Sequence, residues 1–266
     1  MTTEYTGSGD PARTMALLWG TQQPPTRGPK PGLSVERIVR AAIEVADAEG
    51  LATLSMRRLA EHLGVGTMSL YTYLPGKAEL VDVMVDTVHR DPEPVPVPAA
   101  GDPAEWRPRL EVIARADWAR FHRHPWLLQV AATTRPPLGP HLIAKYDRDL
   151  RAVEGIGLDD LEMDSVVNLV AGHVEGAARR SLDALQAPHQ TGQTDQQWWE
   201  AKAALLEKVF DPSRFPTAAR VGPAAGIAYQ AAYDPEHAFV FGLQRILDGI
   251  AALVRSRQED VTESGG

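Results

Sequence analysis

Hydroxyl and aromatic side chains gather in one short stretch of the chain, and their chemistry is hydrogen bonding rather than bond cleavage. The stretch also holds a flexible thioether and ends near an ammonium group; its members are Thr67, Met68, Ser69, Tyr71, Thr72, Tyr73 and Lys77. Hydroxyl groups can bond to base edges or phosphates in a DNA groove, and a lysine can pair with a phosphate. The stretch offers no Arg or Asn for a bidentate base contact, so a preference among DNA sequences would rest partly on shape.

The sequence lacks the motifs of bond-making chemistry. The chain has no Cys, which excludes disulfides, a thiolate nucleophile and thiolate-bound metals. The segment 64–69 superficially resembles a dinucleotide-binding loop, but it follows a helical pattern and lacks the last glycine. His122 and His124 fall on different helix faces, which does not suit a metal pair. We therefore expect no catalysis, no metal and no cofactor.

Short helical patterns surround the hydroxyl-rich stretch. Apolar residues at helical spacing predict helices over about 34–49, 55–63, 67–73 and 77–88. Serines suited to capping begin the first two, and glycines follow the ends of both. The second and third helices are separated by a tight turn, in which Gly64 suits a left-handed conformation.

Two short helices joined by such a turn form a helix-turn-helix, in which the first helix braces the second in the DNA major groove. Ala60 is small where the two helices would cross closely, and Gly64 follows four residues later. The alternative is a plain helical hairpin inside a larger bundle. Such a hairpin requires neither so short a second helix nor two tyrosines beside hydroxyl residues.

These residues also carry a family resemblance. The segment from Leu51 to Leu80, and above all Leu70-Tyr-x-Tyr-Leu-Pro-x-Lys77-x-x-Leu80, resembles the DNA-binding domain of the tetracycline-repressor (TetR) family. Downstream, residues 120–126 and 239–249 are similar to the all-helical C-terminal domain of the subgroup that contains the tetracycline repressor itself. The second resemblance covers most of residues 103–255, and residues 1–25 lie outside it.

The resemblance implies a role for each matching residue. Thr67, Met68 and Ser69 would open the recognition helix and face base edges, whereas Tyr71 and Tyr73 would contact phosphate or thymine methyl groups. The expected DNA contacts are completed by polar and basic side chains around that helix and in the N-terminal arm: Arg27, Lys30, Ser55, Arg57, Thr72 and Lys77. Two alternatives stay open: Tyr73 as a core residue, and the arm residues as a solvated tail.

Composition divides the chain into zones. We expect a flexible arm over 1–33, a DNA-binding domain over 34–90 (the reader), a proline-rich linker over 91–102, a helical domain over 103–257 (the body) and a disordered tail over 258–266. The segment from residue 26 to residue 74 carries a net charge of +1, which leaves −9 for the rest of a chain whose total is −8. This asymmetry concentrates attraction to DNA at one end. No run reaches the roughly 20 apolar residues of a membrane span, so we expect a cytoplasmic protein.

The body has no alternating strand pattern, which makes the expected fold class all-α. Helices are predicted over about 104–122, from Pro125, and over 140–154, 160–185 and 235–257, with breaks at 187–194 and 212–226. The two longest helices are the expected dimer elements, because they are apolar over more than one face. Their glycines would let backbones approach closely: Gly172, Gly176, Gly242 and Gly249. Burial of these faces within one subunit is the alternative.

A ligand pocket is expected among aromatic and polar residues on the body helices, which are Trp118, Phe121, Trp126, Gln129, Asn168, His173, Trp198, Trp199 and Phe239. Asn168 stands between apolar neighbours, so its amide must find a partner. For each residue the alternative is an ordinary core position. The tetracycline repressor binds its drug as a magnesium chelate, but no cluster here has metal-ligand spacing, so the metal is not expected in this chain.

The sequence thus predicts a homodimeric transcriptional regulator that binds a palindromic operator with two recognition helices about 34 Å apart, or a near multiple. We expect a repressor relieved by a small-molecule effector, whose binding displaces the helix over 77–88. An activator or a ligand-independent repressor are alternatives within this class. The alternative outside it is a helical enzyme or ligand carrier that does not bind DNA.

Overall fold

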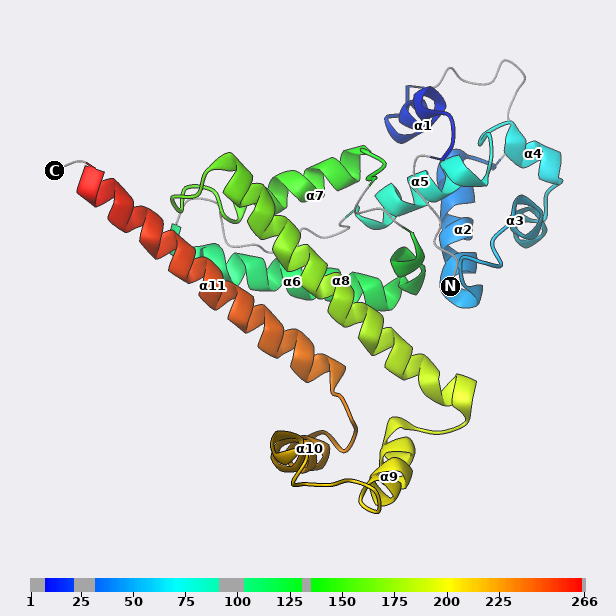
Figure 1. Cartoon of the computed structure of the whole chain (residues 1–266). Coiled ribbons are helices and arrows are strands. Elements are labelled where there is room, and N and C mark those ends of the chain that lie inside the picture. The colour runs from blue at the N-terminus through cyan, green and yellow to red at the C-terminus, as the bar shows by residue number, and fades with distance from the viewer. Residues whose placement is uncertain (1–7, 22–31, 91–102, 131–134, 265–266) are drawn as a thin grey trace. The chain divides into compact units, whose positions relative to one another are not determined.

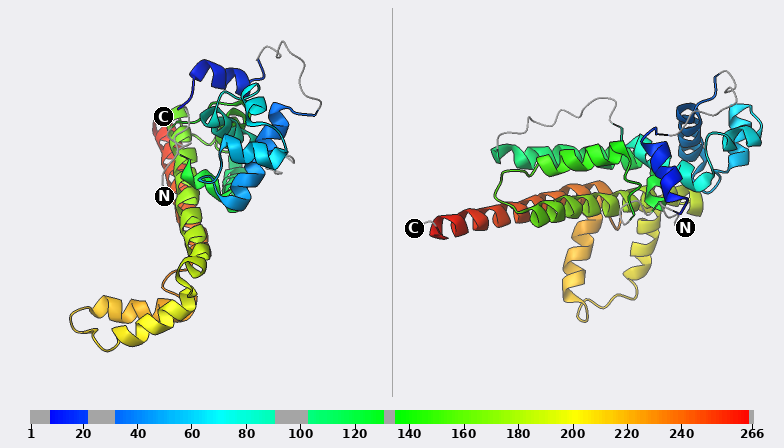
Figure 2. Two further views of the ribbon diagram at one scale, coloured as in Figure 1. Left: turned by 90° about the vertical axis from the view of Figure 1, so that its right-hand side faces the viewer. Right: turned by 90° about the horizontal axis from the view of Figure 1, so that it is seen from above.

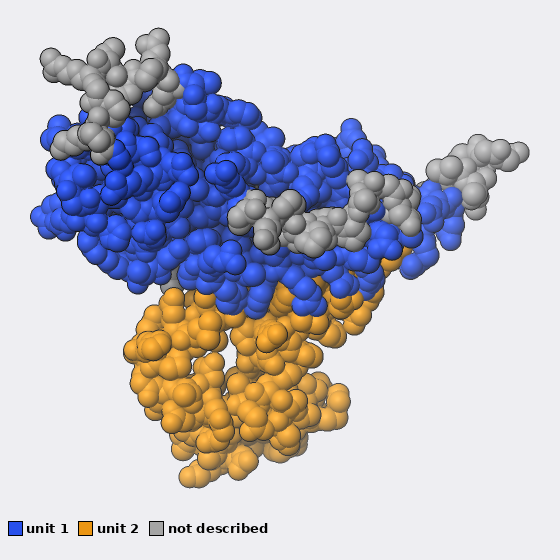
Figure 3. Space-filling view, turned by 180° about the vertical axis from the view of Figure 1, so that it is seen from behind, with its two compact units in different colours: residues 1–168, 253–266 blue, residues 169–252 orange. Residues whose placement is uncertain are grey.

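The structure, a computed structural model, describes residues 8–21, 32–90, 103–130 and 135–264. Every regular element in these ranges is a helix, and none of their residues lies in a strand (Figure 1). The all-α prediction is therefore confirmed. The chain divides into two compact units, unit 1 over 1–168 with 253–266 and unit 2 over 169–252 (Figure 3).

The reader forms the four predicted helices, α2 (Val35–Glu49), α3 (Met56–Leu63), α4 (Thr67–Tyr71) and α5 (Lys77–Val88). Local signals set their ends. The Ser34 hydroxyl accepts a hydrogen bond from the N–H of Arg37 at 3.2 Å, and Ser55 accepts one from Arg58 at 3.1 Å. Gly64 ends α3 in the left-handed conformation, with a φ of 67°. The predicted capping of these helices is confirmed.

The core of the reader is built from the apolar faces of these helices, with α5 at its centre. Eight of the twelve residues of α5 are buried. This helix packs against α2, against α1 (Pro11–Leu18) and against α7 (Pro140–Arg151). The buried residues include three carboxylic acids, Glu79, Asp82 and Asp86. Polar groups buried this deeply need fixed partners, which ties α5 to its neighbours.

A helix stands where the flexible arm was predicted, so that expectation is wrong for residues 11–18. α1 (Pro11–Leu18) begins with Asp10, whose carboxylate accepts hydrogen bonds from the next two free N–H groups, and with a proline in its first turn. Leu17 and Leu18 are buried in the reader core, and the Asp10 N–H donates to Glu79 of α5 at 3.2 Å. Local signals and long-range contacts thus both favour this helix, because the segment 11–18 is rich in strong helix formers and its leucines are buried on the reader.

The rest of unit 1 is helical as predicted. It contains the 3₁₀ turn η1 (Pro103–Glu105), α6 (Trp106–Arg123), the 3₁₀ helix η2 (Pro125–Gln129) and α7 (Pro140–Arg151). The start of α8 and the end of α11 also belong to unit 1, where the Arg257 Nε donates to Glu162 at 3.0 Å. The predicted arm residues Arg27 and Lys30, and the linker over 91–102, lie outside the described residues.

Unit 2 contains the rest of α8 (Asp160–Thr191), then α9 (Asp195–Leu206), α10 (Pro216–Tyr229) and the first part of α11 (Pro235–Ser264). α9 and α10 lie side by side (Figure 2). A Cβ added at Gly226 of α10 would overlap the Trp199 indole of α9, so this glycine lets the two helices approach.

Three expectations for the body are wrong. α8 continues through most of the predicted break at 187–194, and α10 occupies much of the predicted break at 212–226. α11 runs to Ser264, so the predicted tail over 258–266 is mostly helix. The second error arose because the prolines and glycines of this stretch indicated a break, whereas Pro216 lies in the first turn of α10, where a proline is tolerated, and alanines fill much of the rest.

Replacing Leu17 with Ala is expected to lower the free energy of unfolding by about 2 kcal/mol, because it removes a buried side chain from the contact of α1 with the reader core. Met15→Ala on the exposed side of α1 is the matched control and should change stability by less than about 0.5 kcal/mol. Urea unfolding followed by circular dichroism measures both. Equal stabilities of the two variants would mean that α1 is not docked.

Candidate nucleic-acid interface

The turn between α3 and α4 has the geometry of a helix-turn-helix. The Val65 N–H donates to the Ala60 carbonyl at 3.0 Å, and the Gly64 N–H donates to Glu61 at 3.2 Å, which closes α3. Ala60 is buried, as expected where the helices cross. α4 then begins at Thr67, the residue predicted to open the recognition helix.

α4 presents its predicted contact residues to the outside and anchors itself by one leucine. Leu70 is completely buried, whereas Met68 is 78% exposed and Tyr71 is 44% exposed. Thr72 is also exposed, and Thr67 and Ser69 are half-buried. The hydroxyl and thioether groups thus line one accessible edge of the reader, as a groove-reading helix requires.

Tyr73 differs from its neighbours. It is half-buried and packs against the reader core, and its N–H donates to the Leu70 carbonyl at 2.9 Å. The ring of Tyr73 therefore has the core position that was the alternative to a DNA contact. Sequence reasoning could not separate Tyr71 from Tyr73, because α4 ends between them.

The other predicted contacts lie at the ends of α3 and α5. Ser55 caps α3, and Arg57 extends into solvent with an ion pair to Glu61 at 3.4 Å. Lys77 begins α5, and its ammonium donates to the Leu51 carbonyl at 3.4 Å, which ties α5 to the segment between α2 and α3. The contact of Lys77 with the DNA backbone stays a prediction.

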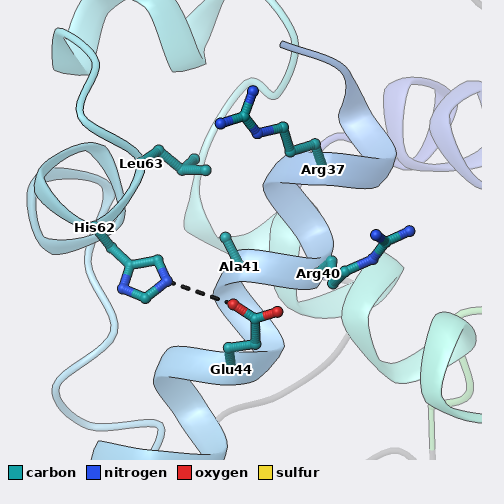
Figure 4. Close-up of a pocket in the computed structure, with 6 residues that line it drawn as sticks. All are labelled: Arg37, Arg40, Ala41, Glu44, His62 and Leu63. Atoms are coloured by element: carbon teal, nitrogen blue, oxygen red, sulfur yellow. Dashed lines mark ion pairs between the residues drawn. The ribbon is translucent and has the colours of Figure 1, made fainter. Parts of the chain in front are cut away.

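A shallow polar pocket of about 370 Å³ lies between α2 and α3 (Figure 4). It is lined by Arg37, Arg40, Ala41, Glu44, His62 and Leu63. The His62 ring faces the Glu44 carboxylate across the pocket, with Nε2 and Oε2 3.5 Å apart. The two arginines, three positions apart on α2, were not among the predicted DNA contacts. Their spacing of three positions, which places both on one face of a helix, could have indicated from the sequence that they lie together.

Comparison with known proteins gives this geometry a family. Residues 38–84 match the family described as "Bacterial regulatory proteins, tetR family", and residues 97–254 match "Tetracyclin repressor-like, C-terminal domain". The HTH-type transcriptional repressor DrrR1 of Streptomyces coeruleorubidus is 47% identical over 261 residues, which is 96% of this chain and 91% of DrrR1. The chain belongs to the TetR family. It is a DNA-binding transcriptional repressor and not an enzyme, so the resemblance found in the sequence is confirmed.

Solved structures agree with this assignment. Apo ActR from Streptomyces coelicolor has a TM-score of 0.67 and 27% identity, covering 87% of this chain and 99% of ActR. ActR in complex with actinorhodin has the same TM-score and identity, covering 84% of this chain and 97% of ActR.

The TetR-family body uses several predicted ligand residues for packing in unit 1. Trp126 is only 1% exposed, and its indole N–H donates to Asp47 of α2 at 2.8 Å. His124 also bonds to Asp47, at 2.9 Å, and Phe121 packs on the same core. Trp126 and Phe121 therefore pack where the body meets the reader. Sequence reasoning could not find this contact, because the partner residue lies far away along the chain.

The other predicted ligand residues of unit 1 have different surroundings. Trp118 is half-buried, with its ring 4.5 Å from that of His122, and Gln129 is half-buried on η2. Asn168 is exposed, and its amide donates to the Asp164 carbonyl of its own helix at 2.9 Å. The amide of Asn168 thus has the partner that the sequence required, and the preceding turn of its own helix supplies it.

In unit 2 the predicted residues join helices in pairs. The His173 ring on α8 stacks on Phe239 of α11, with centroids 6.0 Å apart, and its Nε2 lies 2.9 Å from the Phe239 carbonyl. A Cβ at Gly242 would overlap this ring, so the glycine makes room for it. Trp199 packs on α10, and Trp198 is exposed. No cluster of metal-binding side chains occurs among the described residues.

A buried ionic cluster joins α6 and α7 in unit 1. The Lys145 ammonium lies 2.9 Å from Asp117 and also pairs with Asp149, and Arg120 pairs with Asp117. Although burial alone would raise the pKa of Asp117, Lys145 and Arg120 hold it below its ordinary value. Burial raises the pKa of Asp149. Such a cluster fixes α6 and α7 to each other, since removal of one partner leaves an unpaired buried charge.

His89 at the end of α5 borders this cluster as a neutral group. Its Nδ1 lies 2.7 Å from the Val85 carbonyl, to which it donates. Burial, together with the positive charges of Arg120 and Lys145, lowers the pKa of His89 to about 4.

Acid is therefore expected to destabilise the folded protein through His89. An unfolded histidine titrates near 6.5, so the unfolded chain binds more protons than the folded one between pH 6.5 and about 4. Stability from this group is present at neutral pH and falls as the pH drops through that window, by about 2 kcal/mol between pH 7 and pH 5. His89→Asn, which keeps an N–H donor, should lose less stability over that interval in urea unfolding. Equal losses would show that His89 is not buried as described.

Proposed function

We propose that this protein represses transcription as a homodimer on a palindromic operator and that a small-molecule effector bound in the body releases it. The observation that carries the proposal is the accessible edge of α4, where Met68 and Tyr71 are exposed while Leu70 anchors the helix. Exposed apolar and aromatic groups cost little to desolvate in a DNA groove and offer contacts to thymine methyl groups.

Contacts with the operator are assigned by position in the reader. Thr67, Met68 and Ser69 meet base edges, and Tyr71 with Thr72 meets the sugar-phosphate backbone or methyl groups. Backbone contacts from Ser55, Arg57 and Lys77 fix the register on the duplex. Tyr73 acts mainly as the core support of α4, in line with its half-buried ring.

A second copy of the chain is the proposed partner of α8 and α11. Within unit 2, Leu169 and Leu185 of α8 and Phe241 of α11 are large apolar side chains left exposed in the single chain. Cβ atoms added at Gly172 and Gly176 would meet nothing within 4 Å, which leaves room for another helix. A symmetric pair of such faces would bury these groups and place two recognition helices on one operator.

The effector is proposed to be a small organic molecule bound by the body. The likeness to ActR, which has been crystallised with actinorhodin and with (S)-DNPA, supports this. Of the ligand residues predicted from the sequence, we propose the half-buried Trp118 and Gln129 of unit 1 as contacts of the effector. His173, Trp199 and Phe239 support the helices around them.

The protein acts inside the cell, and we propose the cytoplasm. α11 is long and apolar enough over Pro235–Glu259 to cross a membrane by length and composition, with a mean hydropathy of 1.4. It also carries an exposed ion pair between Arg245 and Asp248, with Nε and Oδ2 2.9 Å apart. Charges of this kind are costly in a bilayer. The proposed dimer contact accounts for the apolar face of α11 without a membrane.

Met68→Ala and Tyr71→Ala are each expected to weaken operator binding about tenfold or more without changing stability, because each removes an exposed contact in both half-sites. Met15→Ala, which truncates an exposed methionine outside α4, is the matched control and should bind as the wild type does. Fluorescence anisotropy with a duplex selected by the wild-type protein from a random pool gives the dissociation constants. Wild-type affinity in both α4 variants would contradict the interface.

Phe241→Glu is expected to shift the protein from a dimer toward a monomer, because it places a charge in the proposed α8–α11 contact. Val209→Glu, at a 79% exposed position after α9, is the control and should leave the dimer intact. Sedimentation equilibrium distinguishes a mass near twice 29.0 kDa from 29.0 kDa. A wild-type protein that is monomeric at micromolar concentration would contradict the dimer.

A further inference from the structure

α7 begins without a cap from its own sequence. The residue before it is Gly139, which has no side chain to accept the free N–H groups of the first turn. The Asp86 carboxylate of α5 takes that place. Its Oδ1 accepts hydrogen bonds from the N–H of His141 at 3.1 Å and of Leu142 at 2.9 Å. One helix thus caps another that lies more than fifty residues away along the chain.

The space around Gly139 is shaped for this carboxylate. A Cβ at position 139 would overlap the carboxyl group of Asp86. The φ of Gly139 is −78°, which any residue can adopt. Glycine is therefore needed here for room and not for backbone conformation, and its role is specific to the Asp86 contact.

Burial makes the cap a rigid connection. Asp86 is only 3% exposed. Burial raises the pKa of Asp86, while the N–H groups of Leu142 and His141 act in the opposite direction. If the start of α7 moved away, the carboxylate would be left buried without these donors, which is costly. The last turn of α5 and the first turn of α7 must consequently move together.

The two joined helices have different attachments. α5 continues from the turn that follows the recognition helix, and Lys77 at its start bonds to the reader backbone. α7 is fixed to α6 through Lys145 and its buried acidic partners, so its position is set by the body. The Asp86 cap is therefore a direct mechanical link between the body and the reader within unit 1.

We infer that Asp86 is a positioning residue for DNA binding: by capping α7 it fixes the orientation of α5, and hence of α4, on the operator. The inference rests on the proposed function and names the contact through which the body regulates it. Asp86 itself does not touch DNA. Loss of the cap lets α5 take several orientations, of which only a fraction is competent to bind, and this lowers the apparent affinity.

The test uses the full chain with Asp86→Ala, Gly139→Ala and the double variant, which break the same contact from opposite sides. Each single variant is expected to raise the dissociation constant for the selected operator about fivefold or more. The double variant should bind like Asp86→Ala alone, because an alanine at 139 has no carboxylate to displace. Asp86→Asn keeps an oxygen acceptor for the two N–H groups and should retain most of the affinity.

Leu17→Ala controls for stability, since it weakens the reader core without touching the cap. Dissociation constants are measured at a temperature where circular dichroism shows every variant folded; if Asp86→Ala does not fold, Gly139→Ala carries the test. Lower melting temperatures with wild-type operator affinity would overturn the inference, because the cap would then serve stability alone. Additive effects in the double variant would also overturn it. A wild-type protein that binds no DNA would instead refute the proposed function.

Discussion

The burial of α5 on every side is the constraint on which the rest of the structure depends. A helix of twelve residues with eight of them buried cannot shift without disturbing what surrounds it. Its neighbours are α1, α2 and α7, and three of its buried residues are acids that require fixed donors. The reader and the start of the body are therefore one packed assembly, and the orientation of α4 follows from contacts made well away from DNA.

The recognition helix divides its side chains between the solvent and the core. Leu70 anchors α4 in the core, while the thioether of Met68 and the phenol ring of Tyr71 stay accessible. Tyr73, two positions further on, turns its ring to the core. In unit 2, by contrast, the aromatic side chains of His173 and Trp199 are seated on glycines of facing helices. Some aromatic residues of this chain thus stay accessible and others pack helices together, and their sequence context alone does not distinguish the two.

The sequence was informative where structure is set by neighbours along the chain. The caps at Ser34 and Ser55 and the left-handed Gly64 allowed the reader to be predicted nearly residue by residue. It was uninformative where a partner lies far away. Trp126 looked like a ligand residue because its hydrogen-bond acceptor, Asp47, is 79 positions away.

The N-terminal helix shows the same limit. The proline and glycine residues on either side of α1 obscured its own helix-favouring sequence, and the burial of Leu17 and Leu18 involves core residues far away along the chain. Asn168 shows the reverse case, because the preceding turn of its own helix supplies the partner that its amide was expected to find. The helices of the reader could thus be predicted from the sequence, whereas the contacts between reader and body could not.

The central claim is that packing around α5 fixes the orientation of the reader and its recognition helix, and in the proposed dimer a distance between the two readers tests it most directly. The chain has no cysteine, so Ala48→Cys, at an exposed position near the end of α2 and outside the proposed DNA contacts, accepts a single spin label in each protomer of that dimer. Pulsed electron paramagnetic resonance should give one narrow distance in the operator complex, because each reader is then held in one place on the duplex. Without DNA, the same label should give a broader distribution in Asp86→Ala than in the wild-type background. Identical distributions in the two backgrounds would contradict the account.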